Sequence, residues 1–182
     1  MNKGIKLATG EIIGFLHSDD EFACKSVLAS VATVFEDNRN ISAVYGDLKY
    51  VKRCNSEITV RHWRSRSFEN NLLRKGWMPP HPTFYVKKRW YIKIGYFNLK
   101  YKISADYNSI FQLFGYSDFN SVYLSKVLVK MKLGGVSNKS INSVFLKSYE
   151  DWKVLRSNGV SIISSVIALF LKNFLKINQF FS

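Results

Sequence analysis

Short apolar runs alternate along this chain with stretches whose apolar residues recur at helical spacing, and this alternation is what most constrains the fold. The segments that we expect to form strands are 11–16, 41–45, 47–52, 58–63 and 127–133, with a hairpin turn at Asn55-Ser56. The segments that we expect to form helices are 2–8, 26–35, 68–74, 104–114 and 141–152. Strands and helices that alternate around one core predict an α/β domain.

Composition narrows the classes of partner. A chain of 182 residues with 47% hydrophobic residues can bury the core of one domain. Its formal net charge of +14 predicts an anionic partner, which is a phosphorylated small molecule, a nucleic acid or an acidic membrane surface. Cys24 and Cys54 lack the spacing of a zinc or redox motif, and no apolar leader follows Met1, so we expect a cytoplasmic protein with reduced thiols.

Two adjacent acids, Asp19 and Asp20, follow the apolar run 11–16 directly. Adjacent carboxylates repel each other, and a divalent cation relieves that repulsion because hard cations prefer carboxylate oxygens. Ligands of open α/β sheets also bind at the carboxyl ends of strands. Taken alone, the two acids favour a solvated loop that caps the next helix, with a metal and phosphate site as the alternative.

A longer run around these acids resembles the central signature of family 2 glycosyltransferases of the GT-A fold. The resemblance is carried by Asn2-x-Gly4-x-x-x-Ala8-x-Gly10-Glu11-x-x-x-Phe15-Leu16-x-Ser18-Asp19-Asp20. It implies that Asp19 faces the nucleotide ribose and that Asp20 binds a Mg²⁺ or Mn²⁺ ion bridging the donor diphosphate.

A second motif is Ser104-Ala105-Asp106-Tyr107, in which Ser104 is an expected N-cap and Asp106 lies in the first helical turn. The family resemblance maps Asp106 onto the aspartate that takes a proton from the acceptor hydroxyl, although many relatives have Glu where this chain has Ala105. A role in helix capping alone is the alternative. The resembling subgroup often has a histidine near the acceptor, which makes His81, in a Pro-rich loop, a candidate for contact with the acceptor, with a structural role as the alternative.

A third motif, Gly134-Gly135-Val136-Ser137, follows the last expected strand. Glycines allow a backbone to approach an anion closely, so Gly134, Gly135 and Ser137 are candidates for binding the nucleotide-sugar. A similar element occurs in the subgroup that includes exopolysaccharide and colanic-acid-type glycosyltransferases. An ordinary strand-to-helix turn explains the motif equally well.

Two basic clusters, residues 61–66 and 87–90, interleave cations with aromatic side chains. This pattern also serves single-stranded nucleic acid, but no nucleic-acid signature accompanies it. We therefore expect an acceptor or membrane role and no nucleic-acid partner, and we keep a basic nucleic-acid-binding module as the lesser alternative.

The tail divides the chain into an expected catalytic part, 1–159, and an amphipathic helix, 160–182. Its apolar run is interrupted by Lys172 after about a dozen residues, too few to span a bilayer. We expect a helix that lies on an anionic membrane, at the inner face of the plasma membrane, with packing on the domain's own core as the alternative.

Together these features predict a glycosyltransferase that moves a sugar from a nucleotide-diphosphate sugar to a saccharide or lipid-linked acceptor in polysaccharide biosynthesis. The resemblance implies inversion at the anomeric carbon and metal dependence. Because the matched run opens the chain, we expect a partial GT-A fold without the first strand-helix units. The alternative is an inactive truncated remnant of such an enzyme.

Overall fold

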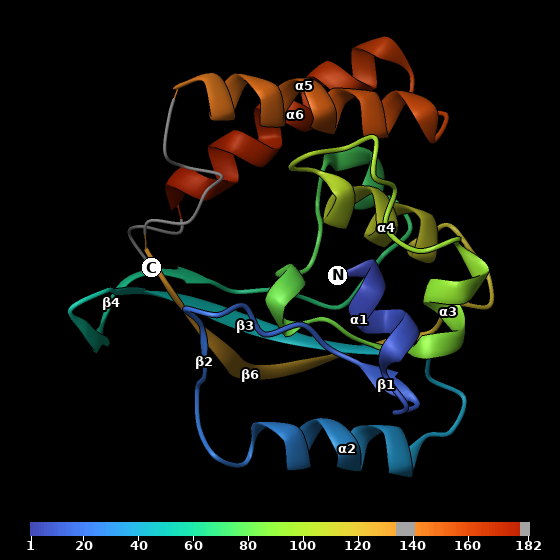
Figure 1. The fold of residues 1–182 in the computed structure, drawn as a ribbon. Coiled ribbons are helices and arrows are strands. Elements are labelled where there is room, and N and C mark those ends of the chain that lie inside the picture. The colour runs from blue at the N-terminus through green and yellow to red at the C-terminus, as the bar shows by residue number, and fades with distance from the viewer. Residues whose placement is uncertain (134–140, 179–182) are drawn as a thin grey trace.

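The computed structural model describes residues 1–133 and 141–178, which form a mixed sheet with helices on both faces (Figure 1). The helices are α1 (Asn2–Leu7), α2 (Val27–Asp37), α3 (Lys88–Lys93), α4 (Ala105–Phe114), α5 (Ile141–Ser157) and α6 (Ile162–Asn178), with short 3-10 helices η1 (Leu73–Lys75) and η2 (His81–Thr83). The strands are β1 (Ile12–Ile13), β2 (Glu21–Phe22), β3 (Ala43–Lys52), β4 (Asn55–Trp63), β5 (Tyr85–Lys87) and β6 (Ser121–Lys132).

The sheet is organised around the pairing of β3 with β6. The strand order is β1-β5-β3-β6-β2. The remaining strand, β4, is not part of this order and pairs with β3. β3 and β6 are parallel, with Ala43 beside Ser121 and Val51 beside Lys132, whereas the other pairs are antiparallel. β3 is apolar along most of its length because both of its faces are covered.

Two apolar cores flank the sheet. On one face, α2 packs Val27, Val31 and Phe35 against β3 and β6 (Figure 1). On the other face, α1, α3 and α4 contribute to a larger core rich in aromatic residues. Apolar residues recur every three to four positions along α2, and that spacing predicts its buried face. The α/β expectation is confirmed.

α5 and α6 form a further layer above α4 (Figure 1). α6 reaches the main core through Ala168, which is 0% exposed, and packs against α5 and η1. Its outer face remains apolar and exposed. The inner face therefore packs on the domain's own core, and the division at residue 160 stays a prediction. Among the residues that the structure describes, no helix has both the length and the apolar character needed to cross a bilayer.

Several local expectations were wrong in detail. The strand expected at 11–16 is reduced to β1, which pairs antiparallel with β5. It ends early because the Phe15 ring packs edge-on against Tyr91 and Phe97 in the core. The first helix ends at Leu7 with an extended C-cap, so Gly10 does not cap it.

The hairpin and one helix also differ from expectation. The turn between β3 and β4 lies at Arg53-Cys54, and Asn55 already belongs to β4. Residues 88–93, which overlap the second basic cluster, form α3 and bury Trp90 and Tyr91. The helix forms because its aromatic side chains pack into the core, and the basic residues around them hide this apolar face in the sequence.

Gly76 tests whether α6 is part of the packed fold. It ends η1 with φ at 77°, and a Cβ there would lie 2.6 Å from the carbonyl oxygen of Ala168. Gly95 has a similar φ of 74° with open space around it. We expect Gly95→Ala to cost about 1–2 kcal/mol of unfolding free energy from backbone strain. Gly76→Ala should cost a further ~1–3 kcal/mol from the clash. Urea unfolding measures both, and equal losses would contradict this packing.

Candidate active site

The acidic loop joins β1 to β2 and sends its two carboxylates to different surroundings. The Asp20 amide donates to the His17 carbonyl at 3.0 Å, which closes a tight turn. Burial raises the pKa of the Asp20 carboxyl, while His17 and Lys132 nearby lower it in part. The Asp19 side chain instead faces outward and forms an ion pair with Arg53 in the turn between β3 and β4.

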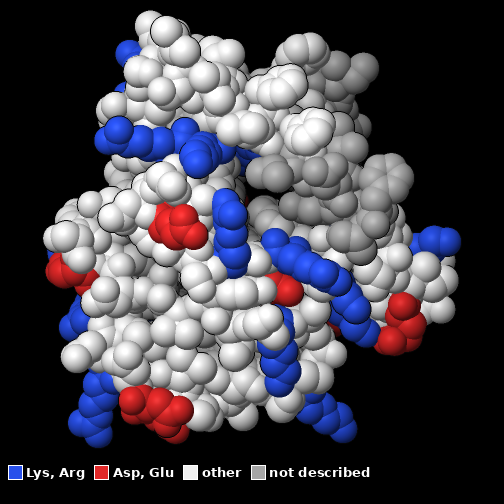
Figure 2. Space-filling view, turned by 180° about the vertical axis from the view of Figure 1, so that it is seen from behind, with Lys and Arg blue, Asp and Glu red and all other residues white. Residues whose placement is uncertain are grey.

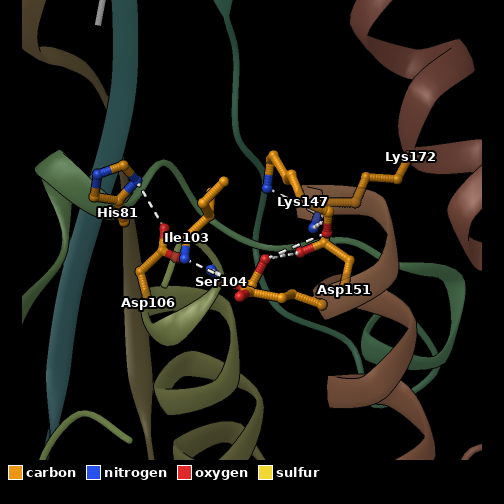
Figure 3. Close-up of polar contacts among 8 residues, drawn as sticks. His81, Ile103, Ser104, Asp106, Lys147, Asp151 and Lys172 are labelled. Carbon is orange, nitrogen blue, oxygen red and sulfur yellow. Dashed lines mark hydrogen bonds and ion pairs between the residues drawn. The ribbon is translucent and has the colours of Figure 1, made fainter. Parts of the chain in front are cut away.

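Asp106 is the second residue of α4, and its carboxylate contacts the imidazole of His81 at the start of η2 (Figure 3). The Nδ1 atom of His81 lies 3.1 Å from Oδ2 of Asp106. Burial lowers the pKa of the His81 imidazole, and Asp106 raises it in part. A ring that is neutral near pH 7 donates one proton, and the carboxylate opposite Nδ1 fixes that proton on Nδ1.

The structure brings Asp20 and Asp106 to one region of the sheet. The His17 and His81 rings meet edge-on with centroids 5.5 Å apart, which links the acidic loop to η2. Burial raises the pKa of the Tyr50 phenol on β3, Arg61 lowers it, and Asp20 and Asp106 both raise it. The sequence motifs assign no role to His17, and here it lies between the two acidic positions.

A small apolar pocket lies beneath the His81–Asp106 pair. Its volume is about 20 Å³, room for about one water molecule. The residues that line it include Phe15, Phe84, Tyr91, Phe97, Ile110 and Leu113. Low polarity on this side strengthens the interaction between His81 and Asp106.

Asp20 is the residue that could hold a divalent metal ion. Its Oδ2 atom is buried and has no hydrogen-bond partner. Over residues 1–133 and 141–178, no group of three His, Cys, Asp or Glu side chains gathers around a common point. One free carboxylate oxygen suits a cation that takes most of its ligands from phosphates and water, as Mg²⁺ commonly does. Asp20 fits such an ion, and the chain provides no complete cage in the described part.

Three expected site residues lie outside the described part of the chain. Gly134, Gly135 and Ser137 belong to residues 134–140, which the structure does not describe. β6 ends at Lys132, whose backbone and ammonium group both lower the pKa of Asp20. The role of the three residues in binding the nucleotide-sugar stays a prediction.

The two basic clusters are used within the fold. Lys87 donates to the Arg39 carbonyl and Lys88 to the Ala8 carbonyl, each at 2.6 Å. In the other cluster, the Arg61 guanidinium lies 4.4 Å from the centre of the Tyr50 ring. These contacts anchor connections between elements.

A network of polar side chains lies at the start of α4 (Figure 3), and no motif in the sequence predicts it. Glu150 and Asp151 of α5 are buried there, beside Ser104 and Lys172. The adjacency of Glu150 and Asp151 is no signal by itself, because Asp19-Asp20-Glu21 and Glu36-Asp37 are adjacent acids as well. Ser104 does precede α4 as expected, but its hydroxyl makes no capping bond to the helix.

A family model described as glycosyl transferase family 2 matches residues 1–108, a range that contains both Asp20 and Asp106. The chain belongs to glycosyl transferase family 2. This family member is 30% identical over 148 residues to PGL/p-HBAD biosynthesis glycosyltransferases of Mycobacterium bovis and Mycobacterium tuberculosis. The match covers 81% of the chain and 55% of those proteins, so the chain spans about half the length of the curated relatives it matches.

Solved structures show the same fold at lower identity. S. aureus TarS superposes with a TM-score of 0.54 at 16% identity, covering 94% of this chain and 48% of that one. TarS in complex with UDP-GlcNAc gives a TM-score of 0.56 at 15% identity, covering 94% of this glycosyltransferase-family chain and 50% of TarS. The expected α/β fold of the GT-A kind is thereby confirmed.

The acidic pair on α5 predicts a loss of stability in acid. Burial raises the pKa of Glu150, but backbone N–H donors lower it more, and the net value is below the ordinary 4.5. Burial also raises the pKa of Asp151, but Lys172 and Lys147 help to lower it below the ordinary 3.8. The folded state therefore binds fewer protons in acid than the unfolded state. This contribution to stability is complete above about pH 4.5 and is lost as the pH falls through the folded-state pKa values.

Glu150→Gln tests this sign. At pH 7 the variant should lose about 1–3 kcal/mol of unfolding free energy. At pH 3, below the ordinary pKa of 4.5, the difference from the unchanged chain should shrink, because protonation of Glu150 then stabilises the unfolded state of the unchanged chain. Urea midpoints at the two pH values measure it, with Glu36→Gln on the exposed side of α2 as the control. A loss of the same size at both pH values would show that the carboxylate charge is not what stabilises this region.

Proposed function

We propose that this chain takes part in transferring a sugar from a nucleotide-diphosphate sugar to a saccharide or lipid-linked acceptor. One arrangement carries the proposal: Asp20 has a buried carboxylate oxygen without a hydrogen-bond partner, and a second carboxylate, that of Asp106, contacts His81, whose ring meets the ring of His17 in the acidic loop. Family membership supports the reaction class. The complex of TarS with UDP-GlcNAc supports a UDP-sugar as the first donor to test.

On the donor side, Asp20 would hold a Mg²⁺ or Mn²⁺ ion. That ion, when bound, stabilises the negative charge that develops on the departing nucleoside diphosphate. Asp19 would accept hydrogen bonds from the ribose hydroxyls, which requires its ion pair with Arg53 to open. Both side chains of this pair are largely exposed, so opening it costs little. Gly134, Gly135 and Ser137 are proposed to contact the diphosphate.

On the acceptor side, Asp106 would act as general base. Its carboxylate would take the proton from the acceptor hydroxyl while that oxygen attacks the anomeric carbon. The bond from this carbon to the diphosphate oxygen breaks, and its electron pair leaves with the diphosphate. Attack opposite the leaving group inverts the anomeric carbon. His81 would stabilise the ionised form of Asp106 and lie beside the incoming acceptor.

The two carboxylates suit these different roles because their surroundings differ. Asp20 is partly buried with a free oxygen, a state that favours a cation or a proton. Asp106 has a neutral imidazole as its partner, which stabilises its charge and leaves the other oxygen available to an acceptor. One carboxylate therefore suits a metal ion, and the other suits proton transfer.

Asp20→Asn and Asp106→Asn separate these two roles. In the full chain, Asp20→Asn should weaken UDP binding in the presence of Mn²⁺ by about tenfold or more, because it removes the charge that holds the ion. Asp106→Asn should leave that binding unchanged and reduce turnover of a UDP-sugar by roughly 10²-fold or more. Calorimetric titration and release of UDP measure the two effects, and Asp37→Asn at the exposed end of α2 is the matched control.

Two results would count against this assignment. Equal loss of Mn²⁺-dependent UDP binding in both aspartate variants would make Asp106 a structural residue. UDP binding that is indifferent to Mn²⁺ and to Asp20→Asn would remove the metal role. If the unchanged chain binds a UDP-sugar without any turnover, the inactive-remnant alternative describes residues 1–182 better.

We further propose that the outer faces of α5 and α6 lie on an anionic membrane, at the inner face of the plasma membrane. Among the α6 side chains that the structure describes, the large exposed apolar ones are Ile162, Ile163, Val166, Ile167, Phe170 and Phe174. The part of the molecule that these helices form is mostly uncharged on the face in Figure 2, with Lys and Arg side chains along its lower border. An apolar face beside cations on a chain of charge +14 complements an anionic lipid surface.

Phe170→Glu tests the membrane proposal without removing the packed face of α6. Phe170 is 72% exposed, and Leu99, on a connection between α3 and α4, is 82% exposed and provides the control Leu99→Glu. We expect the unchanged chain to sediment with phosphatidylglycerol vesicles and less with phosphatidylcholine vesicles. Phe170→Glu should weaken this binding by about tenfold, because a charge opposes insertion, while Leu99→Glu should have no effect. Equal binding to both kinds of vesicle, or none, would refute the proposal.

A further inference from the structure

Two adjacent carboxylates, the only acidic side chains of α5, are buried. The exposed fractions are 5% for Glu150 and 3% for Asp151. Burying a carboxylate costs several kcal/mol unless hydrogen bonds and opposite charges compensate. The partners that provide this compensation are therefore informative about what the pair does.

Glu150 binds the backbone that leads into α4. Its Oε1 accepts a hydrogen bond from the Lys102 amide at 2.9 Å. Its Oε2 accepts from the amides of Ile103 at 2.8 Å and Ser104 at 2.9 Å. One carboxylate thus satisfies three consecutive backbone donors just before the helix begins, a place where donors otherwise lack partners.

Asp151 binds the same turn and connects it to α6. Its Oδ1 accepts from the Ser104 hydroxyl at 2.7 Å (Figure 3). Its Oδ2 pairs with the ammonium groups of Lys172 at 2.8 Å and Lys147 at 3.3 Å. The Lys172 ammonium also lies 3.5 Å from the centre of the Tyr107 ring, on the first turn of α4. Glu150, Asp151 and Lys172 therefore all contact the segment 102–107.

Asp106 lies within this held segment, two residues after Ser104. Ser104 does not cap α4 with its own side chain, because its hydroxyl is engaged by Asp151. The start of α4, and with it the Cα position of Asp106, is thus held from α5 and α6. His81 holds the carboxylate of Asp106 from the opposite side.

We propose that Glu150 and Asp151, with Lys172, are positioning residues that hold Asp106 against His81 in the geometry for proton transfer. This inference rests on the proposed role of Asp106 as base. It goes beyond that role by making α5 and α6 part of the catalytic apparatus. A displacement of about 1 Å at a reacting group can reduce turnover by about 10²-fold, so a clamp of this kind affects rate.

The test compares Lys172→Met, which removes the cation, with Lys172→Arg, which keeps it. The control is Lys153→Met, on the exposed side of α5. In the full chain with labelled aspartate carbons, Asp106→Asn assigns the Asp106 carboxyl signal, and a ¹³C titration then follows it in each variant. We expect Lys172→Met to shift the Asp106 titration and the His81 ring ¹⁵N signals. Lys172→Arg should restore most of both, and Lys153→Met should change neither.

Turnover gives a second measurement. Lys172→Met should lower kcat for UDP release by about tenfold or more with KM nearly unchanged. The double variant with Asp106→Asn should lose little beyond Asp106→Asn alone, because the two changes act on one group. If Lys172→Met prevents folding, Ser104→Ala, which removes only one hydroxyl, replaces it in both measurements.

The outcomes separate this inference from the proposed function. Folded variants whose Asp106 and His81 signals match those of the unchanged chain would overturn the positioning role, whatever the activity. Full turnover in Asp106→Asn would instead overturn the base assignment, and with it the catalytic meaning of the contacts from α5 and α6.

Discussion

The parallel pairing of β3 with β6 is the constraint on which the rest of the structure depends. These two strands run side by side for most of their length and are covered by α2 on one face and by the α1, α3 and α4 layer on the other. β2 pairs with β6, and this pairing sets the position of the acidic loop before β2. β3 also contributes to the core against which α4, the helix of Asp106, packs. The central pair therefore supports both acidic positions.

Some of the positive charge on this chain stabilises the fold and is not available to a ligand. Lys87 on β5 and Lys88 at the start of α3 donate to the backbone carbonyls of Arg39 and Ala8, and Lys172 joins α6 to α5 through Asp151. Lysines engaged in this way contribute to the net charge without offering it to a partner at the surface. A net charge of +14 thus overstates what a nucleotide or a membrane would encounter. The exposed apolar face of α6 is the stronger reason to consider a membrane.

Local sequence determined the elements and the acidic motifs. Helical spacing predicts α2, α4 and α5, and the run ending in Asp19-Asp20 is sufficient by itself to indicate the family. These features are predictable because each depends on neighbours within one or two turns of the chain. The contact of the His17 and His81 rings, which links the acidic loop to η2, has no counterpart in these local patterns.

Only the tertiary structure decided which residues hold those motifs. The pairing of His81 with Asp106 joins positions 25 residues apart, and the Glu150 bonds to the start of α4 join positions more than 40 apart. No periodicity or spacing records such contacts, because they arise when η2 meets α4 and when α5 and α6 pack against the α4 layer. For the same reason Ser104, which the sequence correctly places before α4, binds Asp151 where a local pattern predicts a cap. The sequence determined the groups proposed to do the chemistry, and long-range packing decided how they are held.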